Sequence, residues 1–119
     1  MHVIRADERP PERATAPIFE GLVHTRPLVD GQQGARQLRV LTVTFAPGAR
    51  TKLHYHTHEQ VLVITEGRGI LATEHEEHHV RPGDVVYVPV GERHWHGAEP
   101  DQAMTHLSIN GPGDTIIVE

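Results

Sequence analysis

Glycine and proline interrupt this chain so often that little room is left for a long helix. The segments between them are rich in valine, leucine, isoleucine and threonine, which suit a pleated sheet, and none has a sustained apolar period of about 3.6 residues. They predict strands over residues 21–28, 37–45, 52–56, 60–66, 70–74, 78–80, 85–88, 93–97, 103–109 and 115–118. Many short strands with glycine and proline turns are typical of a sandwich or barrel. The sequence therefore predicts an all-β fold.

Apolar residues that alternate along these segments predict the interior. In the predicted strand 37–45, Leu41, Val43 and Phe45 share one face because successive side chains point to opposite sides of a strand. Leu62 and Ile64 come from the apolar run that follows the histidine-rich segment. We expect these five side chains to shape a pocket for a small-molecule substrate.

The length of 119 residues fits a single domain and leaves no room for a second core. Prolines interrupt residues 5–17, so this part cannot form a stable helix interior. We therefore expect residues 1–20 to form an extended N-terminal arm, and residues 21–119 to form the β-barrel domain. The arm either stays loose or lies across the barrel or a neighbouring subunit.

Composition excludes several classes of function. The formal net charge of -5 offers no basic patch for a nucleic acid. No stretch is long and apolar enough to cross a bilayer, and the first residues lack the apolar core of a signal peptide. We therefore expect no membrane partner and a cytoplasmic location. The chain has no cysteine, which excludes disulfides and thiolate metal sites.

Histidine is unusually frequent in this chain, with eleven copies among 119 residues. All but His2 and His24 lie between residues 54 and 106. Residues two apart on a strand point to the same face, so His54 and His56 can present two imidazoles to one point, and Gln60 has the same parity. The later segment 83–96 can add His94. We interpret this combination as a metal site inside a small barrel. The acidic and histidine-rich run 74–79 is interpreted as a solvated hairpin.

Two spaced motifs resemble the paired signature of the cupin superfamily. The first consists of Gly48, His54, His56, Gln60 and Gly67, and the second of Gly83, Pro89, Gly91 and His94. The resemblance covers about residues 37–110 and implies a single-domain, cupin-type jelly-roll β-barrel. In cupins the histidines of both motifs and the acidic residue of the first bind a divalent metal. The ligands implied here are His54, His56, Gln60 and His94.

This chain departs from the usual signature at two positions. Gln60 replaces the usual glutamate, and Ala98 stands where the second motif often ends in asparagine. The glutamine form is similar to a narrower group of small bacterial cupins that includes manganese-dependent hydroxynitrile lyases. In that group a histidine matching His106 lines the cavity as a candidate acid or base. His96 has the parity of His94 and is a second candidate. The resemblance also implies a homodimer.

The implied ligand set is neutral, because three imidazoles and one amide carry no charge. The full charge of the cation then remains available to polarise a bound oxygen, whereas a glutamate at position 60 would cancel part of it. Imidazole and amide oxygen suit one divalent transition metal per chain, with manganese or iron favoured and zinc, nickel or cobalt possible. A bend over residues 57–59 would instead bring Glu59 or His58 to the metal, so the fourth ligand stays open.

Three functions are compatible with such a site. The favoured one is an enzyme that acts on a small organic hydroxyl or carbonyl compound, like a hydroxynitrile lyase, with His106 or His96 moving a proton. With Fe(II), the same open positions suit a dioxygenase of the cupin type. The third is a non-catalytic small-molecule-binding or accessory protein. The fold alone does not decide among them.

Overall fold

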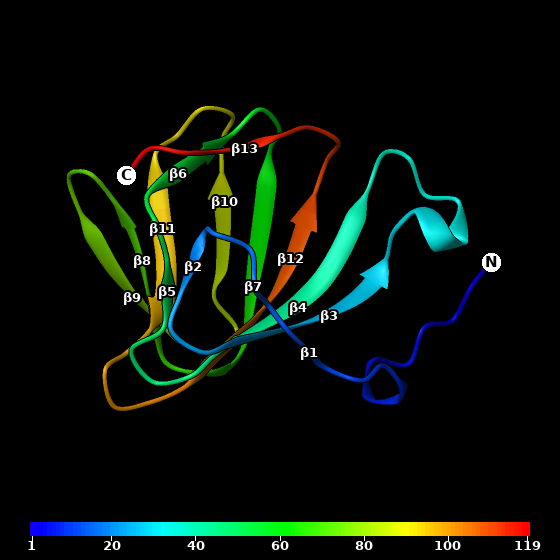
Figure 1. Ribbon diagram of the computed structural model, residues 1–119, viewed down its shortest axis with the longest axis horizontal. Helices are drawn as coiled ribbons and strands as arrows, with labels where there is room; N and C mark the ends of the chain where they lie inside the picture. The colour runs from blue at the N-terminus through cyan, green and yellow to red at the C-terminus, as the bar shows by residue number, and fades with distance from the viewer.

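A computed structural model describes residues 1–119 and confirms the all-β prediction, with two antiparallel sheets curved around one interior (Figure 1). The 6-stranded sheet contains, in spatial order, β1 (Glu12–Arg13), β3 (Val23–Val29), β4 (Arg39–Phe45), β12 (Met104–Asn110), β7 (Gln60–Gly67) and β10 (Val85–Val88). The 7-stranded sheet contains β13 (Thr115–Ile117), β6 (His54–His56), β11 (His94–Ala98), β5 (Arg50–Thr51) and β2 (Phe19–Glu20), with β8 (Gly69–Thr73) and β9 (Glu77–Val80) joined through the pairing of β8 with β11.

The central strands alternate strictly between buried and less buried residues. Every second side chain of β12, from Met104 to Asn110, is buried, and the same alternation runs along the first part of β7. The interior contains both polar side chains, which include several of the histidines, and an apolar cluster. Phe45, Leu62, Ile64 and Met104 are at most 1% exposed and belong to one core cluster. Burial of such side chains supplies most of the stability of the barrel, at about 25 cal/mol per Å² of apolar surface.

Two glycines allow the strands to approach closely where the barrel closes. A methyl group on Gly97 of β11 would lie 2.5 Å from the carbonyl oxygen of Ala49 and 2.5 Å from Cβ of Arg50. Gly67 ends β7 with φ at 78°, in the left-handed region that favours glycine, and packs against the backbone of Ala103. The absence of a side chain at Gly97 lets β5 lie against β11, the strand that also pairs with β6 where the histidines lie.

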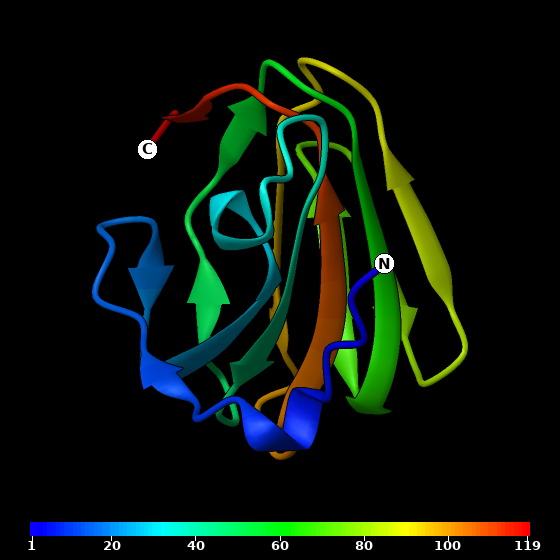
Figure 2. The same cartoon turned by 90° about the vertical axis from the view of Figure 1, so that its right-hand side faces the viewer.

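The first twenty residues pair with the barrel at two points. After the short 3-10 helix η1 (Ala6–Glu8), β1 pairs with β3 and β2 pairs with β5 (Figure 2). A second 3-10 helix, η2 (Gly31–Gln33), is capped by the Asp30 side chain and connects β3 to β4. No helix of the structure is long and apolar enough to cross a membrane.

Each predicted strand coincides with an observed one, with end shifts of one or two residues, and predicted strand 52–56 corresponds to β6. The two-residue strands β1, β2 and β5 were not predicted. The chain pairs as β5 at Arg50–Thr51 and again as β6 at His54–His56, because Lys52 and Leu53 leave the ladder at the corner between them. The run 74–79 forms the exposed turn and outer strand of the β8–β9 hairpin, in agreement with its interpretation as solvated.

Candidate metal centre

Three buried imidazoles converge from two neighbouring strands. His54 and His56 lie on the inner face of β6, and His94 begins β11, directly opposite His54 in the antiparallel ladder. The ring centre of His54 is 4.8 Å from that of His56 and 4.2 Å from that of His94. One potential ligand atom from each of the three residues lies within 4.8 Å of the other two. The parity of β6 and the pairing of β6 with β11 therefore produce a three-histidine group that could bind a metal.

The hydrogen bonds of His54 and His94 fix which nitrogen of each ring carries the proton. Nδ1 of His54 lies 2.7 Å from the carbonyl oxygen of Lys52, and Nδ1 of His94 lies 2.8 Å from that of Glu92. A carbonyl oxygen only accepts, so each Nδ1 is the donor and each Nε2 keeps a free lone pair. Nδ1 of His56 lies 2.8 Å from Oγ1 of Thr115. Nε2 of His56 and Nε2 of His94 are buried without a hydrogen-bond partner.

Burial keeps these imidazoles neutral. Burial, reinforced by the proximity of His94, lowers the pKa of His54 from 6.5 to about 4. Burial, reinforced by His54, His94 and His58, lowers the pKa of His56 to about 3, and burial also lowers the pKa of His94. A neutral imidazole is the form that binds a metal, so at neutral pH the protein needs no deprotonation before it can do so.

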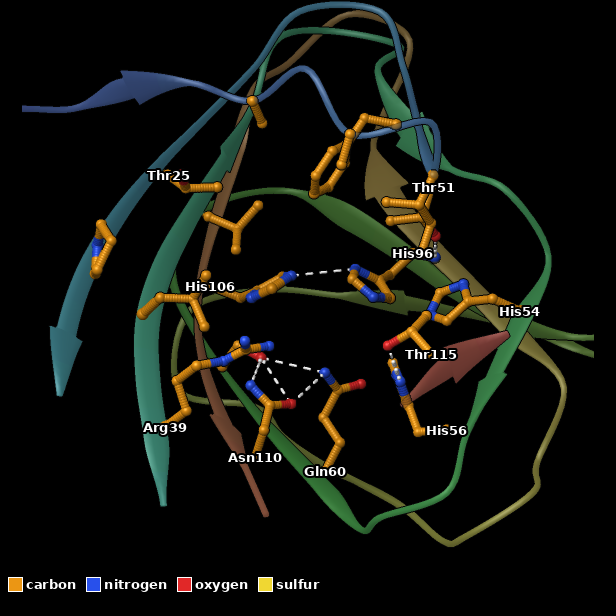
Figure 3. A pocket seen from close by; sticks show the side chains of 18 of the residues that line it. Thr25, Arg39, Thr51, His54, His56, Gln60, His96, His106, Asn110 and Thr115 are labelled. Carbon is orange, nitrogen blue, oxygen red and sulfur yellow. Dashed lines mark hydrogen bonds between the residues drawn. The ribbon is translucent and has the colours of Figure 1, made fainter. Parts of the chain in front are cut away.

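Gln60 faces the same region, whereas Glu59 does not. The Gln60 side chain is buried at the start of β7, and its Oε1 has no hydrogen-bond partner in the protein. Its Nε2 donates to Oδ1 of Asn110 at 2.8 Å and to Oγ of Ser108 at 3.1 Å. Glu59 is exposed and accepts a hydrogen bond from the Tyr87 hydroxyl on the outside of the barrel. Figure 3 shows the Gln60 amide oxygen turned toward the side of the cavity that holds His56.

His96 and His106 form a second buried pair across the cavity. His106 Nε2 lies 3.1 Å from His96 Nδ1, so one of these nitrogens donates and the other accepts (Figure 3). Burial lowers the pKa of His106 from 6.5 to about 4. Burial and the neighbouring His106 lower the pKa of His96 well below 6.5. Nδ1 of His106 is buried without a partner, and both rings pack against Phe45.

A cavity of about 430 Å³ connects the two histidine groups to the surface. Of the apolar residues predicted to shape the pocket, Leu41 and Val43 line this cavity. Phe45, Leu62 and Ile64 do not line the cavity and belong to the hydrophobic core cluster. Alternation along a strand identifies the inner face, but it does not say how far along the barrel axis a side chain lies. His94 also does not line the cavity. Its ring lies next to that of His54, which does line it.

His58, which the sequence offered as an alternative ligand, is 8% exposed, stacks on His56 with ring centres 4.7 Å apart, and lines the cavity. Other residues of the site were not identified from the sequence. Asn110 shares the parity of His106 on β12, which was the signal that could have placed it inside. Thr115 comes from the last strand, and its contact with His56 depends on the pairing of β13 with β6. The remaining lining includes Ala14, Thr15, Ala16, Ile18, Phe19, Thr25, Arg39 and Thr51.

Taken together, these features define a small antiparallel β-barrel protein with a three-histidine group and a glutamine in a solvent-connected cavity. The family model that describes the cupin domain matches residues 41–110, a range that contains both histidine motifs. The chain belongs to the cupin family.

Two relatives are similar to this chain in sequence, and one further structure shares its fold. It is 42% identical over 112 residues to an (R)-mandelonitrile lyase of Granulicella tundricola, covering 92% of this chain and 83% of the relative. It is 34% identical to a cupin-like protein of Thermotoga maritima, whose crystal structure superposes with a TM-score of 0.79 over 86% of this chain and 81% of that one. The polyketide cyclase RemF of Streptomyces resistomycificus, 22% identical, shares the fold with a TM-score of 0.90 over 100% of this chain and 86% of that one.

Proposed function

We propose that this protein binds one divalent transition metal through His54, His56, His94 and Gln60 and acts on a small organic hydroxyl or carbonyl compound. The main support for the proposal is a set of three buried polar atoms without hydrogen-bond partners in the protein: Nε2 of His56, Nε2 of His94 and Oε1 of Gln60. A buried acceptor without a hydrogen bond costs free energy, so groups of this kind call for a partner that lies outside the protein chain.

The residues present fit a transition metal. Nitrogens that bind one cation at about 2.1 Å lie at most about 4.2 Å apart. The ligand atoms here lie within 4.8 Å of one another, so a pair at that limit would have to draw together by at least about 0.6 Å. The Nδ1 hydrogen bonds to Lys52, Glu92 and Thr115 hold the rings with Nε2 available. Neutral nitrogen and amide-oxygen donors suit manganese or iron. We favour manganese because the glutamine form of the motif resembles the manganese-dependent group of small bacterial cupins.

The bound cation would supply Lewis acidity, which stabilises negative charge on a substrate oxygen. The protein supplies the proton transfer and the apolar walls. In cyanohydrin cleavage, the hydroxyl proton passes to an imidazole, the carbon–carbon bond to the nitrile breaks, and its electron pair leaves with cyanide, which then takes up a proton. The neutral pair His106 and His96 offers an acceptor nitrogen for the first proton and can return it to cyanide. Leu41 and Val43 form apolar walls of the cavity.

The test combines metal and substrate. Protein stripped of metal and reloaded with Mn²⁺ should cleave mandelonitrile under nitrogen to benzaldehyde and cyanide, and His106→Leu should lower kcat by about 10²-fold or more. His75→Ala, on the exposed hairpin, is the matched control and should leave the rate unchanged. If Fe(II)-loaded protein instead consumes oxygen with phenolic or diketone substrates, the dioxygenase alternative replaces the lyase. Metal binding without any turnover would favour the non-catalytic binding protein.

We also propose a homodimer formed through the outer face of the 6-stranded sheet. On β10, Val85 is 65% exposed and Tyr87 is 58% exposed, and neighbouring β7 presents Val61 and Val63 on the same side. Contact with a second copy would remove this apolar surface from water. Sedimentation analysis should give a dimer that Val85→Glu dissociates, whereas a monomeric wild-type protein would contradict the proposal. The cytoplasmic location predicted from the sequence stays a prediction.

A further inference from the structure

We propose that Asn110 and Ser108 orient the side-chain amide of Gln60, so that its oxygen and not its nitrogen faces the three imidazoles. This inference rests on the proposed metal centre. The two ends of an amide have nearly the same shape, but only the oxygen has a lone pair for a cation, whereas the NH₂ group presents two positive hydrogens. A glutamine at this position can therefore serve the centre only if the protein selects one of its two orientations.

The hydrogen bonds around Gln60 make this selection. Nε2 donates at 2.8 Å to Oδ1 of Asn110 and at 3.1 Å to Oγ of Ser108, while Oε1 has no partner in the protein. All three side chains are buried, at 6% exposed for Gln60 and 4% for both Ser108 and Asn110. This burial limits the access of water to these bonds. Figure 3 shows the amide nitrogen directed at Asn110 and the amide oxygen directed away from it.

The orientation of Asn110 is itself fixed. Its Nδ2 donates to Oγ of Ser108 at 3.1 Å, so Ser108 accepts from both amides. If Gln60 alone turned over, its oxygen would face Oδ1 of Asn110, and two acceptors would be left opposed. If both amides turned over, Ser108, with a single hydroxyl proton, would face the oxygens of both residues. Either change loses buried hydrogen bonds, so the observed arrangement is the one that satisfies the network.

The strand pairing explains why these residues meet. In the antiparallel pairing of β7 and β12, Asn110 lies directly opposite Gln60. Ser108 precedes Asn110 by two residues and lies on the same inner face of β12. A glutamate at position 60 would present oxygen at both ends and would need no such selection. The requirement for Asn110 and Ser108 therefore arises from the glutamine itself. They are positioning residues that act through Gln60.

The experiment measures Mn²⁺ affinity by calorimetric titration of metal-stripped protein, with no assay of activity. Asn110→Leu should weaken Mn²⁺ binding about 10–100-fold, and the smaller change Ser108→Ala should weaken it by about threefold to tenfold. In a Gln60→Ala protein, neither change should alter the affinity by more than about threefold, because there is no amide left to orient. Ile109→Val, on the opposite face of β12, is the matched control and should bind as tightly as wild type.

The outcomes separate this inference from the metal centre on which it rests. Equal losses in the wild-type and Gln60→Ala backgrounds would show that Asn110 supports the barrel rather than the amide, and would overturn the inference. An unchanged affinity in both Asn110→Leu and Ser108→Ala would overturn it as well. Thermal unfolding of the metal-free variants identifies any that fail to fold, in which case Ser108→Ala carries the test. If wild-type protein binds no Mn²⁺, the metal centre itself is refuted.

Discussion

Acidification of the metal-free protein should unfold it partly through His106. This side chain is 0% exposed, and burial lowers its pKa from 6.5 to about 4. Between these two pH values the unfolded chain binds a proton at His106 that the folded protein does not bind. The stabilising effect is therefore complete above pH 6.5 and is lost as the pH falls toward 4. At about 1.4 kcal/mol per pH unit, the full difference amounts to about 3 kcal/mol.

The assay is urea unfolding in the presence of a chelator at a series of pH values from neutral to mildly acidic. Trp95, whose ring lies 3.9 Å below the Arg50 guanidinium, provides the fluorescence signal. His106→Leu removes the titrating group and keeps an apolar side chain against Phe45. Between pH 7 and pH 4.5 the free energy of unfolding should fall in both proteins. The fall in the variant should be smaller than the fall in wild type by about 2–3 kcal/mol.

The control is Leu107→Ala on the outer face of the same strand, which can lower stability but should leave its dependence on pH unchanged. If the free energy of unfolding depends on pH in the same way in wild type and in His106→Leu, the prediction is wrong. That result would mean that His106 takes up its proton equally in the folded and unfolded states.

Three further predictions concern packing and the ligand set. Gly97→Ala should lower the free energy of unfolding by about 3 kcal/mol in denaturant titration, because the new methyl group overlaps the backbone of Ala49 and Arg50; wild-type stability would contradict the close approach of β5 and β11. Phe45→Ala should cost about 3–5 kcal/mol in the same assay, because it empties a core position that is 0% exposed; a loss below about 1 kcal/mol would contradict its place in the core. Gln60→Glu should tighten Mn²⁺ binding about tenfold by adding a negative charge, and should slow turnover; unchanged affinity would mean that position 60 does not contact the metal.

The sequence predicted the fold well because its signals are local. Glycine and proline mark the turns, and strand parity placed His54 and His56 on one side and Leu41 and Val43 on the inner face. What it missed depends on which strands pair and in which register. The contact of Gln60 with Asn110 joins residues 50 positions apart, and that of His56 with Thr115 joins residues 59 positions apart.

The alternation of side chains along a strand also did not show which inward-facing side chains line the cavity and which lie in the core. Phe45, Leu62 and Ile64 do point inward, but they lie in the core cluster and do not line the cavity. The position of Glu59 follows from the same alternation: it points outward to Tyr87 because Gln60 and His58 point inward. The sequence left Gln60, Glu59 and His58 as alternative ligands because a bend at residues 57–59 could have changed the parity. The structure brings both Gln60 and His58 to the cavity and leaves Glu59 outside it.

We propose above that three imidazoles from β6 and β11 hold one cation. The most direct measurement is the equilibrium binding of Mn²⁺ to metal-stripped protein, followed by elemental analysis after removal of free metal. We predict about one ion per chain for the wild-type protein and for His75→Ala, in which only the exposed hairpin is altered. We predict less than about a tenth of an ion for His94→Ala, with the barrel still folded by circular dichroism. Wild-type protein that retains no divalent ion, or a His94→Ala protein that retains as much as wild type, would contradict the account.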